Sequence, residues 1–143
     1  MKEGNNLDKL YYKKEIYKTA GIINTISNNI ANNALKSEIG YKLPKSYMKF
    51  YNDSTSKNES NYSGVIPIKK KSNWNIINEN KDFQKYINPP KGIIPVMTDG
   101  TGNFYCLDYR KDTKNPSILY YDNSVKGRDR FSVVDNKIKD FFK

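Results

Sequence analysis

The chain has no histidine and a single cysteine, Cys106, among its 143 residues. These absences exclude an intramolecular disulfide, the common zinc sites and the nucleophiles that depend on an adjacent imidazole. They also remove the side chain that most often changes its charge near neutral pH. Any catalysis would therefore depend on carboxylates, lysine or tyrosine. We expect the Cys106 thiol to be buried and inert within a central strand.

Long hydrophobic runs are also missing. No segment approaches the roughly 20 apolar residues of a membrane span, and the first residues lack the apolar core of a secretory signal. A length of 143 residues fits one domain that can bury a core without disulfides. We therefore expect a cytoplasmic protein without a membrane partner.

Arginine is scarce although the net charge is +10. Clustered cations gain affinity for nucleic acid by releasing counterions from phosphate. However, the residue best suited to bidentate contacts occurs only as Arg110, Arg128 and Arg130. The one continuous basic run, Lys69–Lys71, is typical of a solvated strand end. The bias toward Lys, Asn and Ile is also what an A·T-rich coding sequence produces, so nucleic-acid binding stays an alternative.

The segment Gly92 to Tyr109 carries the strongest local signal. Two apolar runs, Ile93 to Met97 and Phe104 to Tyr109, flank the turn Asp99–Gly102, in which two glycines accommodate the positive φ of a chain reversal. A phosphate-binding loop is the alternative. It lacks a following lysine and the GxGxxG spacing, and a strand follows it instead of a helix. The pattern predicts a β-hairpin.

Helical periodicity dominates the first 40 residues. A first helix is expected between Leu7 and Ala20, with Gly21 interrupting or ending it. A second is expected from near Ser27, a residue type favoured at N-caps, to Gly40, a residue type favoured just past a helix end. Its predicted inward-facing residues are Ile30, Ala34, Leu35 and Ile39.

Pro44 is suited to the first turn of a third helix. Tyr47, Phe50 and Tyr51 would share one face of this helix. The polar segment 52–63 is expected to be a loop.

The remaining elements are mostly strands. Val65 to Ile68 is expected to be a short strand, and its proline indicates either an edge position or a strand end. Ile118 to Tyr121 would extend the hairpin into a meander. Asp135 to Phe142 is predicted to form a closing helix, with Val133 or Val134 also available to pack on the sheet. A helical connection before Pro89 would carry Trp74, Ile77 and Tyr86. The predicted fold class is α+β, with helices packed on a mostly antiparallel sheet.

Four motifs follow one another in a defined order. They are the Leu43–Pro44 step with Tyr47, the hairpin from Pro95 to Asp108, the strand 117–122 and the segment 135–142. This order resembles the SUKH superfamily of Smi/Knr-like domains from about residue 30 onward. The resemblance implies a single domain over residues 1–143, in which residues 1–26 form an N-terminal helical extension. The residues that carry the fold signature are Leu43, Pro44, Tyr47, Pro95, Gly102 and Asp108.

The resemblance also implies a function. SUKH proteins include bacterial immunity proteins, which bind a cognate polymorphic or contact-dependent toxin and neutralise it, and regulators or scaffolds. We accordingly expect a cognate toxin as partner, no enzymatic activity and no cofactor or metal. The net charge of +10 leaves two alternatives: the toxin presents an acidic surface, or the charge is not used in binding. Recognition tends to occur on loops carried by a rigid sheet. The expected partner-binding residues are Asp99, Thr101, Asn103, Asp122 and Lys126.

Two other chemistries remain open at this level. Asp99, Asp108 and Asp122 lie near predicted strand ends, where paired carboxylates can perform acid/base chemistry or bind a cation. We favour structural roles at turns and strand ends for all three. The 12 tyrosines are the second feature, because exposed ones would suit a protein-binding face or a stacking platform. The simpler interpretation is that tyrosine replaces phenylalanine or leucine and keeps its hydroxyl in water.

Overall fold

The computed structural model describes residues 2–56 and 64–135, with side chains from 18 to 54 and from 64 to 135. Within these ranges, helices precede a four-stranded antiparallel sheet with the strand order β1-β2-β3-β4. The predicted α+β class is confirmed. The elements are α1 (Lys2–Ile39), α2 (Lys45–Ser56), α3 (Ile76–Asp82), the π-helical turn η1 (Phe83–Ile87), β1 (Ile93–Thr98), β2 (Phe104–Asp108), β3 (Ser117–Tyr121), the 3₁₀ turn η2 (Gly127–Arg130) and β4 (Phe131–Asp135).

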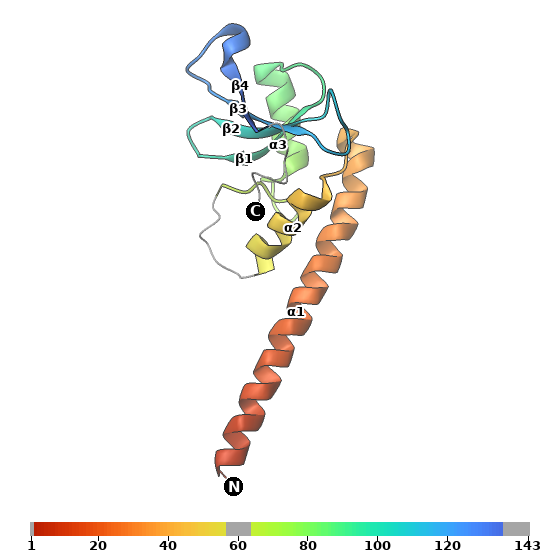
Figure 1. Cartoon of the computed structure of the whole chain (residues 1–143), viewed down its shortest axis with the longest axis vertical. Coiled ribbons are helices and arrows are strands. Elements are labelled where there is room, and N and C mark those ends of the chain that lie inside the picture. The colour runs from red at the N-terminus through yellow and green to blue at the C-terminus, as the bar shows by residue number, and fades with distance from the viewer. Residues whose placement is uncertain (1, 57–63, 136–143) are drawn as a thin grey trace.

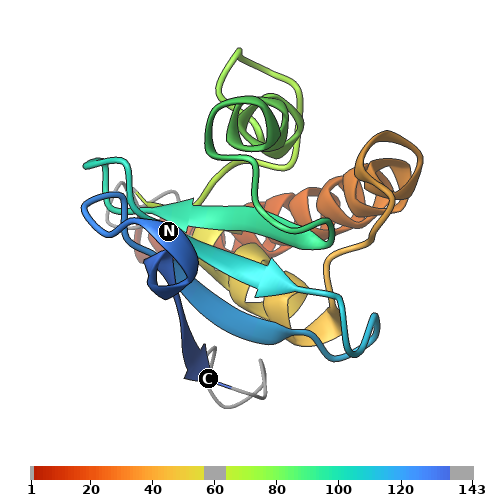
Figure 2. The same ribbon diagram turned by 90° about the horizontal axis from the view of Figure 1, so that it is seen from above.

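The sheet is packed on both faces. Helix α2 lies beneath it (Figure 1), and α3 lies beyond the β1 edge (Figure 2). Side chains alternate between the faces along each strand, so Leu107 packs with the α2 residue Tyr47, whereas Cys106 packs with Phe83 of η1. The predicted burial of Cys106 is confirmed, and burial raises the pKa of its thiol. The central strands therefore connect two hydrophobic clusters.

Buried tyrosines form much of the larger cluster. Tyr47 and Tyr51 lie on one face of α2 with Phe50, as predicted, and the ring of Tyr47 lies 5.9 Å from that of Phe50. The Tyr47 hydroxyl donates to the carbonyl of Val96 at 3.3 Å, and the Tyr51 hydroxyl accepts from the backbone N–H of Ile68 at 3.0 Å. Burial raises the pKa of both phenols. The expectation that each hydroxyl stays in water is therefore wrong for these two residues, which bind the backbone.

The segment between α1 and α2 is fixed by buried polar contacts. Gly40 ends α1 with a φ of 88°, as its position predicted. The side chain of Asn32 then binds both backbone groups of Leu43: its amide donates to the carbonyl at 3.0 Å, and its oxygen accepts from the N–H at 2.7 Å. The Tyr109 hydroxyl donates to the carbonyl of Lys42 at 2.8 Å. Residues 40–44 are thereby held against both α1 and the sheet.

Helix α1 differs from the prediction, because one continuous helix runs through Gly21 and Ser27. A single internal glycine costs about 1 kcal/mol relative to alanine, which is too little to end a long helix. The predicted inward face is also partly wrong. Leu35 is buried, but Ile30 is 64% exposed and Ala34 is exposed as well.

The polar segment 52–63 is likewise not a loop throughout, because α2 continues to Ser56. The amide of Asn28 donates to Asn52 Oδ1 at 2.9 Å, and the buried Ser54 hydroxyl donates to the Phe50 carbonyl. These contacts with α1 and within α2 extend the helix despite its polar composition. Residues 57–63 of the predicted loop lie outside the described residues.

Two more differences concern the sheet and its edge. The predicted strand at Val65 contributes only a single bridge, to Met97. Strand β4 was not predicted, and its Val133 is 61% exposed instead of packed on the sheet. Asp135 of the predicted closing helix ends β4, and residues 136–142 lie outside the described part. The helical connection at α3 is confirmed, although Trp74 precedes the helix and Tyr86 is exposed.

The contact between Asn32 and Leu43 generates a stability prediction with a neighbouring control. Asn32→Ala leaves a buried N–H and a buried carbonyl without their partner, which should lower the free energy of unfolding by about 2–3 kcal/mol. Asn33→Ala changes the exposed neighbour and should stay within about 0.5 kcal/mol of the wild type. Urea unfolding followed by circular dichroism measures both. Equal midpoints for the two variants would contradict the proposed contribution of Asn32.

Candidate binding site

The predicted partner-binding residues lie in two neighbouring turns at one end of the sheet. Residues 99–103 connect β1 to β2, and residues 122–126 follow β3; together we call them the paired turns. The backbone N–H of Asn123 donates to Asn103 Oδ1 at 2.8 Å, and the Asn123 amide donates to the Thr101 carbonyl at 2.6 Å. The structure therefore brings together residues that are 20 positions apart and joins them directly. Lys126 is exposed beside them.

Asp99 organises the first of the paired turns. Its carboxylate accepts from the Thr101 hydroxyl at 2.6 Å and the Thr101 N–H at 2.9 Å, and also from Asn103 and Tyr120. These hydrogen bonds, those from Thr101 above all, lower the pKa of Asp99 to about 2. Because the Asp99 carboxylate accepts hydrogen bonds from several nearby residues, its main effect is to hold the turn in one conformation.

Asp122 has an equivalent role in the second turn. It accepts from the hydroxyl of Ser124 at 2.7 Å and from its N–H at 3.0 Å, and these bonds lower the pKa of the carboxyl. Asp108 lies at the opposite end of β2, where Arg110 binds it through Nε and Nη2 at 2.9 and 3.0 Å. Burial acts to raise the pKa of Asp108, but the hydrogen bonds from Arg110 outweigh it and the pKa is lowered.

The three aspartates thus do not form one acidic centre. Asp99 and Asp122 lie at one end of the sheet and Asp108 at the other, and each has internal hydrogen-bond donors. Among the side chains that the structure describes, in residues 18–54 and 64–135, no three acidic or cysteine groups converge as metal ligands would. The geometry fits the turn and strand-end roles that the sequence favoured.

The residues of the predicted fold signature have structural positions in the core, at a helix start, in a strand and in a turn. Leu43 and Tyr47 are almost fully buried, and the carbonyl of Pro44 accepts from the N–H of Met48 at the start of α2. Pro95 is buried in β1 opposite Cys106. Gly102 has a φ of 90°, and a Cβ added there would overlap the side-chain amide of Asn123. These residues shape the surfaces on which recognition can occur.

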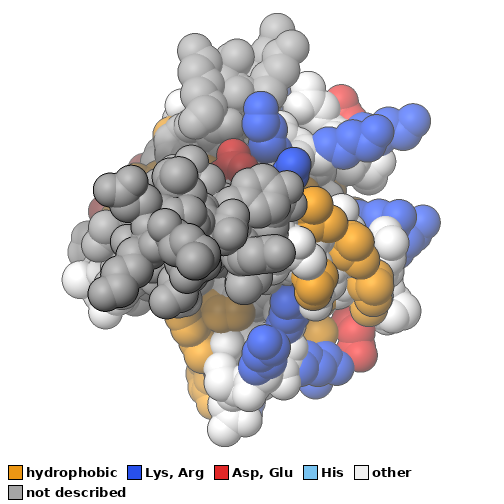
Figure 3. Space-filling view, turned by 90° about the horizontal axis from the view of Figure 1, so that it is seen from below, with side chains coloured by type: hydrophobic (Ala, Val, Ile, Leu, Met, Phe, Trp, Pro, Cys, Tyr) orange, Lys and Arg blue, Asp and Glu red, His pale blue; other side chains and the backbone are white. Residues whose placement is uncertain are grey.

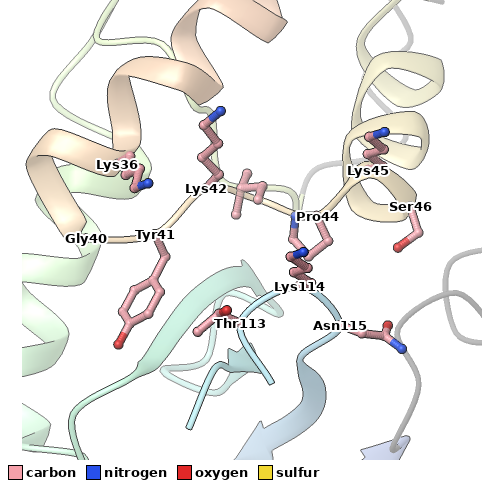
Figure 4. Close-up of a pocket in the computed structure, with 11 residues that line it drawn as sticks. Lys36, Gly40, Tyr41, Lys42, Pro44, Lys45, Ser46, Thr113, Lys114 and Asn115 are labelled. Atoms are coloured by element: carbon pink, nitrogen blue, oxygen red, sulfur yellow. The ribbon is translucent and has the colours of Figure 1, made fainter. Parts of the chain in front are cut away.

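A second candidate surface was missed by the sequence reasoning. Lysine and arginine side chains are scattered over the face of the molecule in Figure 3. Four lysines, however, line a single hollow of about 950 Å³. No acidic residue lines this hollow, which we call the basic pocket. Its walls come from Gly40–Ser46, Lys36 and the β2–β3 loop (Figure 4). The four lysines are Lys36, Lys42, Lys45 and Lys114.

The basic pocket has a rigid frame. Tyr41 stacks on Tyr109 with ring centroids 4.5 Å apart, and the contacts of Asn32 and Tyr109 with residues 42 and 43 hold the neighbouring backbone. In the β2–β3 loop, Asp112 accepts from the N–H groups of residues 114 and 115 at 2.9 and 3.1 Å. The four ammonium groups form no ion pair with any described residue. A fixed, concave, positive surface of this kind attracts an acidic partner.

Only the Leu43–Pro44 motif pointed toward this part of the chain. Lys114 is distant from the other three lysines in sequence, so no spacing rule connects it with them. The folded β2–β3 loop brings it to the segment between α1 and α2 (Figure 4).

Comparison with known proteins finds one family model that matches most of the chain. The family model described as SMI1 / KNR4 family (SUKH-1) matches residues 29–143, which include the paired turns and the basic pocket. No curated protein and no solved structure is significantly similar. Among the described helices, none has both the length and the apolar character needed to span a membrane.

Two glycines in the first of the paired turns allow a matched test of how the turns are joined. Gly100→Ala should lower the free energy of unfolding by about 1 kcal/mol, because alanine is strained at a φ of 83°. No clash adds to this strain, since a Cβ at residue 100 meets no described atom within 4 Å. Gly102→Ala has the same strain and also displaces Asn123 from Thr101, adding about 1 kcal/mol. Thermal unfolding of both variants measures the difference. A Gly102 variant as stable as the Gly100 variant would show that the contact adds nothing.

Proposed function

The chain belongs to the SMI1 / KNR4 family (SUKH-1), and from this membership we propose that it is an immunity protein of the bacterial cytoplasm. In this role it binds a cognate polymorphic or contact-dependent toxin and blocks it by protein–protein contact, without catalysis or a cofactor. The observation that carries the proposal is the family match over residues 29–143, because the family includes toxin immunity proteins.

The charge distribution supports the basic pocket as a contact surface for the toxin. Its four lysines are exposed and line the hollow, and they form no ion pair with any described residue. The carboxylates of the paired turns, in contrast, accept hydrogen bonds from their own turns. We propose that an acidic segment of the toxin occupies the basic pocket. The predicted contacts at Asp99, Thr101, Asn103, Asp122 and Lys126 stay a prediction for the same complex.

The toxin domain encoded beside this gene should copurify with the protein and lose its activity in the complex. Replacing Lys36, Lys42 and Lys114 together with glutamate should weaken binding about tenfold or more, mainly by slowing association, because charged surfaces steer encounter. The matched control replaces Lys81, Lys85 and Lys91 with glutamate. These three lysines are exposed outside the pocket, so the control changes the net charge by the same amount. Surface plasmon resonance at two salt concentrations measures the rates.

The outcomes separate the function from its contact surface. A toxin that stays fully active in a stable complex would remove the immunity assignment. A toxin that is inhibited but responds equally to both lysine triples would keep the assignment and remove the basic pocket from the interface. In that second case, Lys126→Glu and Asn103→Ala test the paired turns as the contact surface.

Nucleic-acid binding is the second candidate, favoured by the net charge of +10 and the basic pocket. All three arginines also line another hollow of about 780 Å³. However, Arg110 is paired with Asp108, and Arg130 donates to the carbonyl of Ile87 at 2.9 Å, so two of the three are already engaged. This candidate requires DNA or RNA affinity at physiological salt that falls steeply with added salt. Fluorescence anisotropy that shows no binding under these conditions would remove it.

A further inference from the structure

Helix α1 exposes a stripe of isoleucines, two of which, Ile22 and Ile26, border α2 at Asn52 and Asp53. Ile22, Ile23, Ile26 and Ile30 are 53, 61, 55 and 64% exposed, and we call them the isoleucine stripe. At about 100° of rotation per residue, they occupy an arc of roughly 100°. The same rotation places the buried residues Asn28, Asn32 and Leu35 on the opposite side of the helix. The apolar side of this helix is therefore not the side that the domain covers.

Charged side chains lie at the edge of the isoleucine stripe, where Lys18 and Asp53 line a shallow hollow together with Ile22 and Ile26. Residues 19–35 include no acidic or basic residue, although the chain carries a net charge of +10. Within residues 19–35 an acidic partner would find no cation, and at the edge of the stripe Lys18 lines the same hollow as Asp53. Another copy of the chain, in contrast, can approach this segment without bringing lysines together at the centre of the contact. The lack of cations along residues 19–35 thus favours a second copy over an acidic partner.

The spacing of the stripe suits pairing of two helices. Ile23, Ile26 and Ile30 are separated by three and four residues, which is the spacing of successive a, d and a positions in a coiled coil. Helix α1 extends well beyond the rest of the domain (Figure 1), so a second helix can lie along it. Three of the four isoleucines precede residue 29, where the family match begins. The stripe is thus mostly an addition to the family domain.

We propose that two copies of this chain associate through the isoleucine stripe, with their α1 helices side by side. Each copy presents the same patch to the other, as in a twofold symmetric contact. Burying exposed apolar side chains on both copies supplies the attraction. The proposal rests on α1 alone and is independent of the proposed immunity function.

Sedimentation velocity of the full chain over a wide concentration range tests the association. The wild type should show a concentration-dependent dimer. Ile26→Asp should raise the dissociation constant about tenfold or more, because it places a carboxylate in an apolar seam. The matched control is Ala20→Asp, which adds the same charge at an exposed position about 120° around the helix. The control should dimerise like the wild type.

A cysteine variant gives an independent readout. Cys106 is 0% exposed, so an introduced thiol is the accessible one in the folded chain. Ile26→Cys should form a disulfide-linked dimer under mild oxidation, whereas Ala20→Cys should form little disulfide-linked dimer on a denaturing, non-reducing gel. Circular dichroism confirms that each variant is folded.

Three outcomes would overturn the proposal. One is a wild-type chain that stays monomeric up to several hundred micromolar. Another is an Ile26→Asp variant that dimerises as strongly as the wild type. The third is a monomeric wild type whose binding to the toxin or to neutral lipid vesicles is lost in Ile26→Asp, which would assign the stripe to that other partner.

Discussion

The double hydrogen bond between the Asn32 side chain and the backbone of Leu43 is the constraint on which much of the structure depends. In the interior, a backbone group without a partner costs about 1–3 kcal/mol, so this one amide holds the path of the chain after α1 has ended at Gly40. It thereby places Tyr47 beneath the sheet and brings Lys42 close to Lys36 at the basic pocket. Tyr109 adds a second anchor from the sheet to the same segment.

Charged residues at the two candidate surfaces differ in what they can offer a partner. In the paired turns, Asp99 and Asp122 accept hydrogen bonds from nearby residues and thereby shape the backbone. At the basic pocket, the lysines surround a hollow whose lining holds no carboxylate. Exposure alone does not distinguish the two groups. The two groups differ in their internal bonding, because the aspartates accept hydrogen bonds from their own turns and the lysines form no ion pair with a described residue. The basic pocket is therefore the stronger candidate for recognition of an acidic partner.

The elements that were predicted correctly depend on local chemistry. The turn glycines specify the hairpin, Pro44 precedes a helix, and Gly40 ends one. The elements that were missed depend on distant contacts. Asn28 supports the end of α2 through Asn52, and β4 forms by pairing with β3. Ile30 misled the assignment of the inner face of α1, because an apolar residue is ordinarily expected to be buried, whereas Ile39 packs against the core as predicted.

Local propensity and motif order were enough to establish the α+β class, the family resemblance and the burial of Cys106, because backbone preferences and short-range spacing are properties of neighbouring residues. The folded chain alone decided which lysines surround one pocket, which tyrosine hydroxyls bind the backbone and which side of α1 remains apolar and exposed. Burial and hydrogen bonding depend on residues that are far apart in sequence. Those properties therefore become defined only when the chain packs.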